Sequence, residues 1–570
     1  MTGDVPASLP RHLQRYVCDQ EYERYTPQDH AVWRFVMRHL VRVLSRAAHP
    51  VYLEGLEKTG IRLDRIPRIE EINARLSAFG WSAVIVDGYI PPAVFTEFQM
   101  RRVLAIARDM RRIDQILYTP APDIVHESAG HAPFIVDVDY AEYLQRFGQI
   151  GLDAISSRAD QAVYAAMRAL SDIKQDGAAT DSDVSAAQAH LDEAIAANDG
   201  RSEAARLARL GWWTIEYGLV GTLADYRIFG AGLLSSLGEC RSCLDDARVP
   251  KRTLTVEAVR VPYDITREQP QLFVARSCQH LSQVLETFAD GMCFRRGGSP
   301  SLRTAIASGT VCTARYGSTG LEVSGRFDRV MTDAVDNPVY IGTRGPTQLA
   351  RGGRELAEHG VARHVHGFGS PVGRVQGLAR CLSDYPVDAL RQHGIGIGRS
   401  ARFDFLSGVV VEGRLLRVLR EGGRNLVLTF ADCTATGPEG ERLFEPAWGE
   451  YDMAVGDAID SVHGGPADRE RYPQEAGAPA RRMRSASGPD DGALQAIYAA
   501  IDRLRDASPS KIDALRQRLR AHPADWLARL ELLRHATGSA AQALRDELGA
   551  IALADAVAAP LIRMGLDHAA

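Results

Sequence analysis

Hydrophobic positions recur at spacings of three and four residues through most of the first half of the chain, and this spacing predicts helices. Residues 27–107 follow the pattern with one interruption, a short β-like run at 81–86. Two alanine-rich segments, 160–174 and 182–197, are predicted to form a helical hairpin on the surface. A further helix is predicted at 203–219, and more at 270–292. The first part of the chain is therefore predicted to be mainly α, with short β segments.

After Gly297 the pattern changes to short alternating runs rich in Gly, Thr and Val. Alternation with a period of two predicts strands, so we expect a β-rich domain at 300–463. Residues 464–493 contain Pro, Gly, Ala and Arg without apolar periodicity and are predicted to be a linker. Helical spacing returns at 494–570. The predicted order is a helical domain at 1–299, a β-rich domain, a linker and a helical C-terminal segment.

The composition is that of a globular protein and excludes several classes. Of 570 residues, 45% are hydrophobic and 24% are charged, and the net charge is −5, so we expect no nucleic-acid partner. The sequence has no secretory signal and no apolar run long enough to span a membrane, so we expect a cytoplasmic protein without a membrane partner. Eight cysteines are too few for a disulfide scaffold. Cys240 and Cys243 are predicted to be two ordinary thiols rather than a zinc site.

The segment 118–133, with the sequence YTPAPDIVHESAGHAP, carries the most informative pattern. Its prolines exclude a helix before Asp123, which is a suitable N-cap for a helix that begins at the next residue. His126 and His131 would lie about 140° apart on an ideal α-helix, against about 40° for an i,i+4 pair. The two imidazoles can converge on one metal ion only if the helix is distorted, which Gly130 could permit. The spacing is therefore not that of the HExxH zinc peptidases.

Glu216 is the best candidate for a third ligand. It is a single carboxylate in the apolar and aromatic segment 211–219, GWWTIEYGL, where an unpaired buried charge would be costly and a divalent cation would compensate it. Two histidines and one carboxylate, with coordination positions left open, form the facial triad of non-haem Fe(II) oxygenases. The alternative is that His126 and His131 are hydrogen-bonded core histidines and Glu216 belongs to a salt bridge.

Three ordered blocks resemble the tetrahydropterin-dependent aromatic amino acid hydroxylases, the phenylalanine hydroxylases among them. Residues 118–133 match the family pattern YTPxPDIxHExxGHxP at every fixed position, and 229–239, FGAGLLSSLGE, match another block. The block between them is matched by Trp212, Thr214, Glu216, Gly218 and Leu219. The resemblance covers roughly the first half of the chain. It implies a hydroxylase-like catalytic domain that uses Fe(II), a tetrahydropterin and O2 to hydroxylate the ring of an aromatic amino acid, with L-phenylalanine to L-tyrosine as the first choice.

The resemblance also implies roles for individual residues. His126, His131 and Glu216 match the iron ligands, and Glu127 matches a catalytic carboxylate that faces the pterin. The other matched residues are Gly88, Ile90 and Phe95 for the pterin, Arg111 and Thr119 for the substrate carboxylate, Trp212 and Pro122 for the side-chain pocket, and Ser235 for a catalytic hydroxyl. Phe95 stands in the place of the ring that stacks on the cofactor. An arginine suits a carboxylate because its guanidinium is a bidentate fork.

The chain departs from the family at a few positions. Gly211 stands where the animal enzymes have a tyrosine, and Pro92 replaces a serine of the pterin loop. The hairpin at about 160–197 is longer than the family's usual connection. Because these differences concern the substrate pocket more than the reaction, tryptophan hydroxylation and hydroxylation at another ring position stay open.

Two other classes of protein fit part of the pattern. Residues 126–131 also satisfy HExxxH, a zinc-peptidase motif, but Glu216 lies 85 residues after His131, whereas that class takes its third ligand from a nearby acidic motif. The second alternative is a non-catalytic interaction protein on a hydroxylase scaffold, against which the complete ligand set and Arg111 argue.

The C-terminal half is less informative. His364 and His366 could bind a metal, but without a nearby cluster of carboxylates or cysteines we favour a structured turn. Residues 394–398, GIGIG, are not a GxGxxG fingerprint. The last helices have apolar faces that either mediate a homo-oligomer or pack on the β-rich domain.

Overall fold

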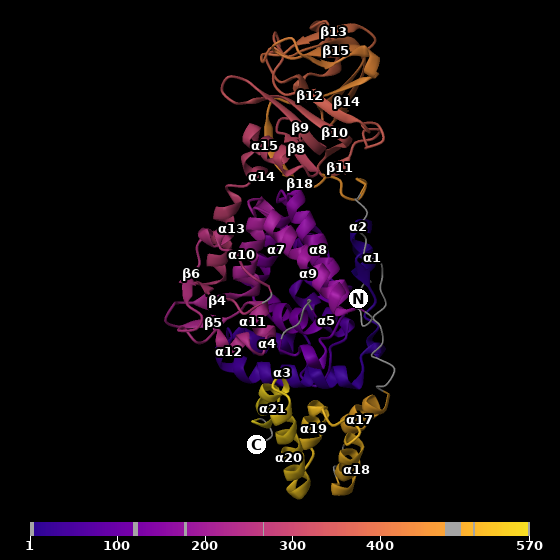
Figure 1. The fold of residues 1–570 in the computed structure, drawn as a ribbon. Helices are drawn as coiled ribbons and strands as arrows, with labels where there is room; N and C mark the ends of the chain where they lie inside the picture. The colour runs from indigo at the N-terminus through magenta and orange to yellow at the C-terminus, as the bar shows by residue number, and fades with distance from the viewer. Residues whose placement is uncertain are drawn as a thin grey trace.

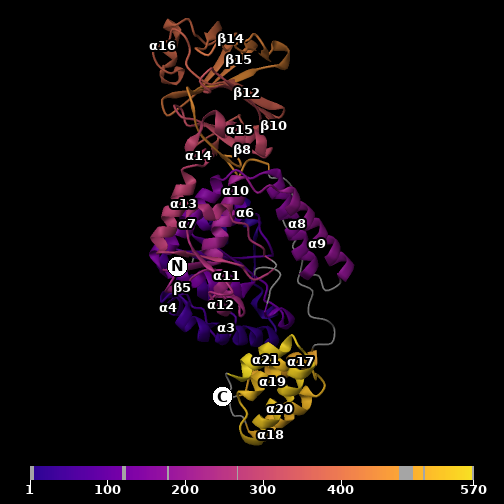
Figure 2. The same cartoon turned by 60° about the vertical axis from the view of Figure 1, so that its left-hand side comes forward.

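The computed structural model describes residues 5–117, 123–175, 179–265, 267–473, 492–504 and 508–567. The three predicted regions lie one after another along the long axis of the molecule, with the N-terminal helical region in the middle (Figure 1). The β-rich region lies at one end and the C-terminal helices at the other, and the turned view shows the same order (Figure 2). Within the described ranges, no helix is both long and apolar enough to cross a membrane.

The N-terminal region is built mainly of helices. These are α1 (Val5–Ser8), α2 (Arg11–Gln14), α3 (Pro27–Ala47), α4 (Val51–Lys58), α5 (Ile69–Leu76), α6 (Pro92–Met100), α7 (Val138–Asp153), α8 (Arg158–Gln175), α9 (Asp181–Ala197), α10 (Glu203–Gly211), α11 (Ala231–Ser235), α12 (Glu239–Ser242) and α13 (Cys278–Ala289). The predicted hairpin is confirmed as α8 and α9, although part of its predicted connection lies outside the described residues.

The long helix α3 shows how the sequence sets an element. Thr26 is its N-cap, since its side chain accepts from the amide of Asp29 while the Asp29 carboxylate accepts from the amide of Thr26. Pro27 fills the first helical position, where its missing N–H costs nothing. Val32, Val36 and Leu40 of the helix face the core and are almost fully buried.

Two small sheets complete this region. One has the order β1 (Val17–Cys18), β2 (Ser82–Val86), β3 (Val103–Ala107), with β2 and β3 parallel. The other has the order β5 (Tyr226–Ile228), β4 (Gly218–Gly221), β7 (Leu272–Ala275), β6 (Lys251–Thr253).

Three segments that were predicted to be helical contain a strand at one end. Residues 103–107 form β3 instead of helix, residues 218–221 form β4, and residues 272–275 form β7. Val103–Ala107 and Leu272–Ala275 are buried at every position. A strand buried on both faces shows no alternation, so its pattern is that of a buried helix.

The β-rich region begins after α14 (Cys293–Arg296) and α15 (Gly298–Ser308) and contains two antiparallel sheets. The first has the order β11 (Arg354–Glu355), β10 (Pro338–Arg351), β9 (Leu321–Thr332), β8 (Cys312–Tyr316), β18 (Ile459–Gly464), and β12 (Gly367–Pro371) also pairs with β10. The second has the order β13 (Ser400–Asp404), β14 (Val410–Glu421), β15 (Arg424–Thr436), β16 (Arg442–Phe444), and β17 (Tyr451–Ala454) pairs with β15. The short helix α16 (Val387–Gln392) precedes the second sheet.

The C-terminal helices pack on the N-terminal region. They are α17 (Gly492–Asp502), α18 (Pro509–Leu519), α19 (Trp526–Leu533), α20 (Gly538–Ala554) and α21 (Ala558–Leu566). The ring of Trp526 lies edge-on to that of Phe35 of α3, with 5.1 Å between centroids, and the apolar residues of both regions form one continuous core. The predicted packing on the β-rich domain was therefore wrong, because the apolar partner of these helices is α3 (Figures 1 and 2). Most of the predicted linker lies outside the described residues.

Candidate functional site

A distorted helical turn brings the two predicted histidines together. Residues His126–His131 form a π-helix, in which hydrogen bonds join residues five positions apart. Residues at i and i+5 therefore lie one turn apart on the same face. The predicted distortion is present, and Gly130 serves it differently from what we expected. A Cβ at position 130 would lie 2.8 Å from the carbonyl oxygen of Ala231, so glycine here allows α11 to pack closely.

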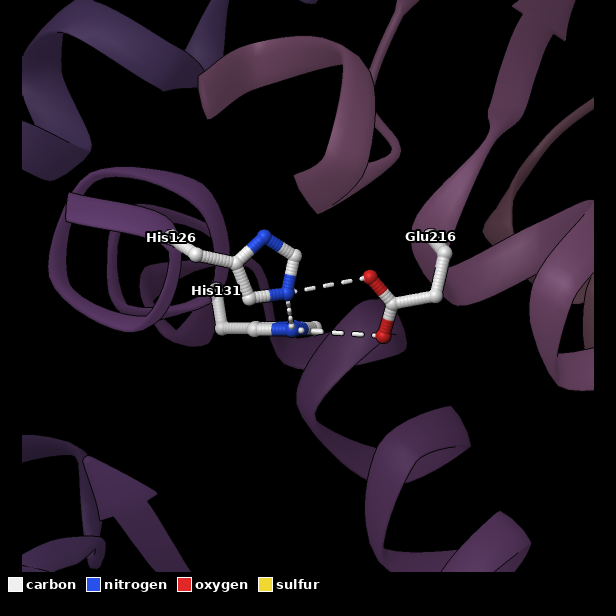
Figure 3. Close-up of side chains that lie close together, drawn as sticks. All are labelled: His126, His131 and Glu216. Carbon is white, nitrogen blue, oxygen red and sulfur yellow. Dashed lines mark hydrogen bonds and ion pairs between the residues drawn. The ribbon is translucent and has the colours of Figure 1, made fainter. Parts of the chain in front are cut away.

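Glu216 completes the cluster from a second π-helical turn, Trp212–Glu216, which follows α10. Its Oε2 lies 3.2 Å from Nε2 of His126, and its Oε1 lies 3.4 Å from Nε2 of His131. The two Nε2 atoms are 3.2 Å apart. All three side chains converge on one point (Figure 3).

The charge of Glu216 is set by these neighbours. Burial raises the pKa of this carboxyl, but His131 and His126 outweigh burial and hold the pKa below its ordinary value. The group is therefore a carboxylate at neutral pH. Two imidazoles and a carboxylate at these distances form a donor set for a divalent transition metal.

Ser235 fixes the tautomer of His126. The Ser235 hydroxyl donates to the carbonyl of Ala231 at 2.8 Å, so it must accept from Nδ1 of His126, 3.0 Å away. With the proton on Nδ1, the lone pair of His126 is on Nε2, which faces Glu216. The structure therefore places the Ser235 hydroxyl behind the His126 ring, and its role as a catalytic hydroxyl stays a prediction.

Arg111 and Asp123 form a fully buried bidentate pair beside the turn that carries the two histidines. Nε and an Nη of Arg111 donate to the two Asp123 oxygens at 2.7 and 2.9 Å, and the other Nη donates to the carbonyl of Ser235 at 3.0 Å. Asp123 also accepts from the amide of His126 at 3.0 Å, so the predicted N-cap is confirmed. One carboxylate therefore connects Arg111 to the first histidine.

Glu127 is the other buried acid of the turn. It is 7% exposed, and burial raises its pKa to about 8. Its Oε2 lies 3.9 Å from Nε2 of His131. The carboxyl therefore borders the histidine cluster and lines the cavity described next.

A cavity of 2420 Å³ opens onto this cluster. The predicted pterin residues Gly88, Ile90 and Phe95 line one wall of it, as do Arg111 and Trp212. Phe95 lies in the first turn of α6 rather than on the preceding loop. Pro92, which departs from the family, opens that helix at a position that favours proline.

Trp212 lies between two tyrosine rings. Its ring centroid is 4.7 Å from that of Tyr217 and 4.3 Å from that of Tyr263, and both pairs are stacked. Gly211 precedes it, and a Cβ there would lie 2.8 Å from the ring of Phe147, so Phe147 fills the space that a larger residue at 211 would need. The predicted substrate residues Thr119 and Pro122 lie outside the described residues.

Two cavity residues were missed by the sequence analysis. Glu239 accepts from the hydroxyl of Tyr217 and from the amide of Gln269, both at 3.1 Å, and burial raises its pKa to about 7. Tyr164 of α8 donates to the carbonyl of Tyr89 at 3.1 Å, which ties the hairpin to the segment that carries Gly88. Glu239 ends the third family block and so could have been found, whereas the hairpin gave no signal.

The fold and the cluster define a class before any relative is considered. A mainly helical domain that holds two histidines and a carboxylate together beside a large cavity is typical of mononuclear non-haem metalloenzymes.

Comparison with known proteins narrows this class. Residues 16–168 and 186–295 match the sequence pattern of the biopterin-dependent aromatic amino acid hydroxylases. The phenylalanine-4-hydroxylase of Ralstonia nicotianae is 31% identical over 268 residues, which are 47% of this chain and 72% of that protein. The phenylalanine-4-hydroxylase of Pseudomonas aeruginosa is 29% identical over 277 residues, 48% of this chain and 88% of that protein. The chain belongs to the biopterin-dependent aromatic amino acid hydroxylase family.

One solved structure that matches this chain is that of Chromobacterium violaceum phenylalanine hydroxylase with bound iron(III) and 7,8-dihydrobiopterin. It is 27% identical, covers 49% of this chain and 88% of that chain, and has a TM-score of 0.38. The family match ends at residue 295 and leaves out 169–185. The β-rich region, the C-terminal helices and the tip of the hairpin therefore lie outside it.

Proposed function

We propose that this chain is a monooxygenase that hydroxylates the ring of L-phenylalanine to L-tyrosine with O2, non-haem Fe(II) and a tetrahydropterin. The observation that carries the proposal is the convergence of His126, His131 and Glu216 inside the segment that matches the hydroxylase family. Relatives in several bacteria bear the name phenylalanine-4-hydroxylase.

The donor set fits Fe(II). His126, His131 and Glu216 would hold the ion, because one carboxylate and two neutral imidazoles suit a divalent iron and occupy only one side of it. Bound iron and tetrahydropterin together supply the activation of O2 and the electrons that it needs.

The cavity wall fits a flat heterocycle. Gly88, Ile90 and Phe95 would bind the pterin, with the Phe95 ring against its face, and the Glu127 carboxyl borders the same space. A carboxyl whose pKa burial raises to about 8 is protonated at neutral pH and can donate a hydrogen bond to a pterin heteroatom.

The chain's own residues would orient the amino acid. Arg111, with Thr119, would bind its carboxylate, and Trp212, with Pro122, would hold its ring. Arg111 is bonded to Asp123, which accepts from the amide of His126, and to the carbonyl of Ser235, whose hydroxyl accepts from the His126 ring. The substrate carboxylate and the metal ligand would therefore share one rigid frame. Such a frame holds the reacting groups at a fixed distance, which is the main contribution that a protein makes to a reaction between bound partners.

Phenylalanine is the first choice of substrate, and tryptophan or another ring position is the alternative. The Glu239 carboxyl and the Tyr217 hydroxyl place polar groups beside the stacked Trp212. Because a hydroxyl or an indole N–H could hydrogen-bond to these groups, tyrosine and tryptophan should be assayed beside phenylalanine.

We also propose the predicted organisation of the chain. Residues 1–299 form the catalytic domain, 300–463 the β-rich domain, 464–493 the linker and 494–570 the helical segment. The family match from 16 to 295 supports the first boundary. A cytoplasmic location and a homo-oligomer through the C-terminal helices stay predictions.

The test is anaerobic reconstitution of the full chain with Fe(II), followed by a tetrahydropterin assay with phenylalanine, tryptophan and tyrosine and identification of the products. Tyrosine formed from phenylalanine with one O2 consumed per product is the expected result. Zinc with peptide hydrolysis would replace the proposal by the peptidase alternative, and iron-loaded protein without turnover of any of the three would favour the interaction protein.

A second measurement tests the ligand assignment. Glu216→Gln removes the negative ligand, and we expect it to lose more than nine-tenths of the bound iron and all activity. Glu239→Gln changes another buried carboxyl of the same cavity and should keep its iron. Full iron occupancy in Glu216→Gln would contradict the assignment.

A further inference from the structure

A second cluster of two histidines and a carboxylate lies in the β-rich region, away from the site described above. His359 and His364 belong to the connection between β11 and β12, and Asp452 belongs to β17. Nδ1 of His359 lies 3.3 Å from Nε2 of His364, and Oδ2 of Asp452 lies 3.9 and 4.0 Å from these two nitrogens. None of the three lines the large cavity.

The main chain holds the two imidazoles in place. The carbonyl of His359 accepts from the amide of Leu349, and that of His364 accepts from the amide of Thr347, so both histidines are anchored to β10. Their rings are stacked, with 5.6 Å between centroids. The edge of Phe368 covers His364 at 5.2 Å.

The carboxylate is held equally firmly. Arg363 donates to both oxygens of Asp452, and the Thr429 hydroxyl donates to Oδ1 at 2.6 Å. Arg363 also pairs with Glu450, and Arg417 pairs with Glu450 and Glu358. Three carboxylates stand against two guanidiniums, so a net negative charge remains around the histidines.

The spacing of the three groups does not suit hydrogen bonding alone. His359, His364 and Asp452 are 5%, 7% and 6% exposed. Neither histidine nitrogen is within hydrogen-bond distance of the carboxylate, although both face it. The two imidazoles are within hydrogen-bond distance of each other, and Asp452 accepts from Arg363 and Thr429, so no hydrogen bond joins the histidine pair to the carboxylate that it faces.

The spacing does suit a metal ion. Zinc–nitrogen bonds of about 2.0–2.1 Å in a tetrahedral site place neighbouring ligand atoms about 3.4 Å apart. The histidine pair has this separation, and the carboxylate needs to move by about half an ångström.

We propose that His359, His364 and Asp452 form a second metal site that binds a divalent transition ion, zinc by its donor chemistry, with a structural role. Two imidazoles and one carboxylate are zinc ligands. β12 pairs with the first sheet and β17 with the second, so the ion joins the two sheets of the β-rich region. The burial of all three ligands fits a structural ion rather than a catalytic one.

The test counts metal equivalents on the full chain. Metal-free protein is titrated with Co²⁺, which is followed by its visible absorption, and with Zn²⁺, which is followed by elemental analysis after desalting. We expect two equivalents in the unmodified chain and one in a variant that carries His126→Ala and Glu216→Gln. That variant should also unfold several degrees higher with one equivalent of Zn²⁺ than without it.

Variants of the second site give the matching loss. His359→Ala with His364→Ala, and separately Asp452→Asn, should each bind one equivalent, the one held by His126. His366→Ala, an exposed histidine of the same connection, is the control and should bind two. A second-site variant that still binds the metal ion held by His126 is thereby shown to be folded.

Two results overturn the proposal. One is a single equivalent in the unmodified chain that disappears with His126→Ala and Glu216→Gln. The other is two equivalents that survive the loss of both His359 and His364. If the second-site variants do not fold, the count on the first-site variant decides, because zero equivalents there excludes a second site.

Discussion

Asp123 does two tasks at one point of the catalytic site. Its oxygens accept from Arg111 on one side and from the amide of His126 on the other. Burial raises the pKa of this carboxyl, but Arg111 outweighs burial and holds it below its ordinary value. The Asp123 carboxylate therefore fixes the orientation of the Arg111 guanidinium and also caps the helical turn that begins with His126.

Arg111→Lys tests the fork. Lysine keeps the charge but cannot make paired N–H bonds to a carboxylate. We expect the KM for phenylalanine to rise by about 10- to 100-fold, since a bond to a charged group contributes about 1.5–3 kcal/mol, and the pterin KM to change less than twofold. Steady-state kinetics and iron content are measured together, with Arg112→Lys, an exposed neighbour, as control. An unchanged phenylalanine KM would remove the assignment.

Glu239 provides a pH prediction. Burial raises its pKa to about 7 from an ordinary 4.5. The folded chain therefore binds the proton more tightly than the unfolded chain, and stability falls as pH rises from about 5 to 8, by up to about 3 kcal/mol. Glu239→Gln has no proton to lose there, so we expect its free energy of unfolding to fall less over this range. Denaturant unfolding at four pH values checks this, and Glu257→Gln, an exposed acid, should follow the unmodified chain. If the free energy of unfolding falls equally with pH in the unmodified chain and in Glu239→Gln, the prediction is wrong.

At the scale of the element, both turns that carry the proposed metal ligands are π-helical. The spacing of five between His126 and His131 contains this information, because an α-helix cannot place such residues on one face. The sequence therefore predicted a distortion as well as the residues. It could do so because these ligands lie in short contiguous motifs.

Other features could not be predicted, for reasons that are physical. β3 and β7 are short and buried at every position, so their pattern does not distinguish strand from helix. Asp452 lies 88 residues after His364 in the sequence, and only the pairing of β17 with β15 brings it to the histidine. We had favoured a structured turn at His364 because no cluster of carboxylates or cysteines is near it in the sequence.

The hairpin of α8 and α9 contacts the segment that carries Gly88, one of the residues proposed to bind the pterin. The tip of the hairpin lies outside the family match. Tyr164 of α8 joins the hairpin to the carbonyl of Tyr89 by a hydrogen bond. Tyr164→Phe removes this bond and the hydrogen bond between the same hydroxyl and Arg168, and it leaves the ring in place. We therefore expect the pterin KM to rise about fivefold, which corresponds to about 1 kcal/mol, while the phenylalanine KM stays unchanged. Steady-state kinetics with each substrate varied measures both constants. Tyr226→Phe, which loses a bond to Asp246 outside the cavity, is the control. Equal changes in both KM values would show that the hairpin acts on the whole site instead.

At the scale of the whole molecule, the N-terminal region is held from both ends. The Glu203 carboxylate accepts from the amides of Ile155 and Cys293, which joins α10 to the approach to the β-rich region. Arg158 and Thr310 make further bonds across the same boundary. At the other end, α3 shares its core with the C-terminal helices. The extra half of the chain is therefore bound to the catalytic region by polar bonds on one side and by an apolar core on the other.

Arg34 of α3 marks the apolar side. It donates to Glu531 of α19 at 2.6 Å and to Asp502 of α17 at 3.0 Å, and the Arg34 and Glu531 side chains are 8% and 10% exposed. Breaking a buried pair leaves an uncompensated charge, which costs about 3–5 kcal/mol when no other partner remains. Because Asp502 still contacts Arg34, we expect Glu531→Gln to cost less, about 1–3 kcal/mol, and to lower the temperature at which the chain unfolds by several degrees. The kcat/KM for phenylalanine at 25 °C should stay within twofold, since Glu531 does not line the cavity. Asp388→Asn removes an exposed pair with Arg391 and should leave the unfolding temperature unchanged.

If Glu531→Gln unfolds at the same temperature as the unmodified chain, the C-terminal helices do not depend on this ion pair for their attachment to α3. If it loses activity without unfolding, the helices act on the catalytic site rather than only on its stability.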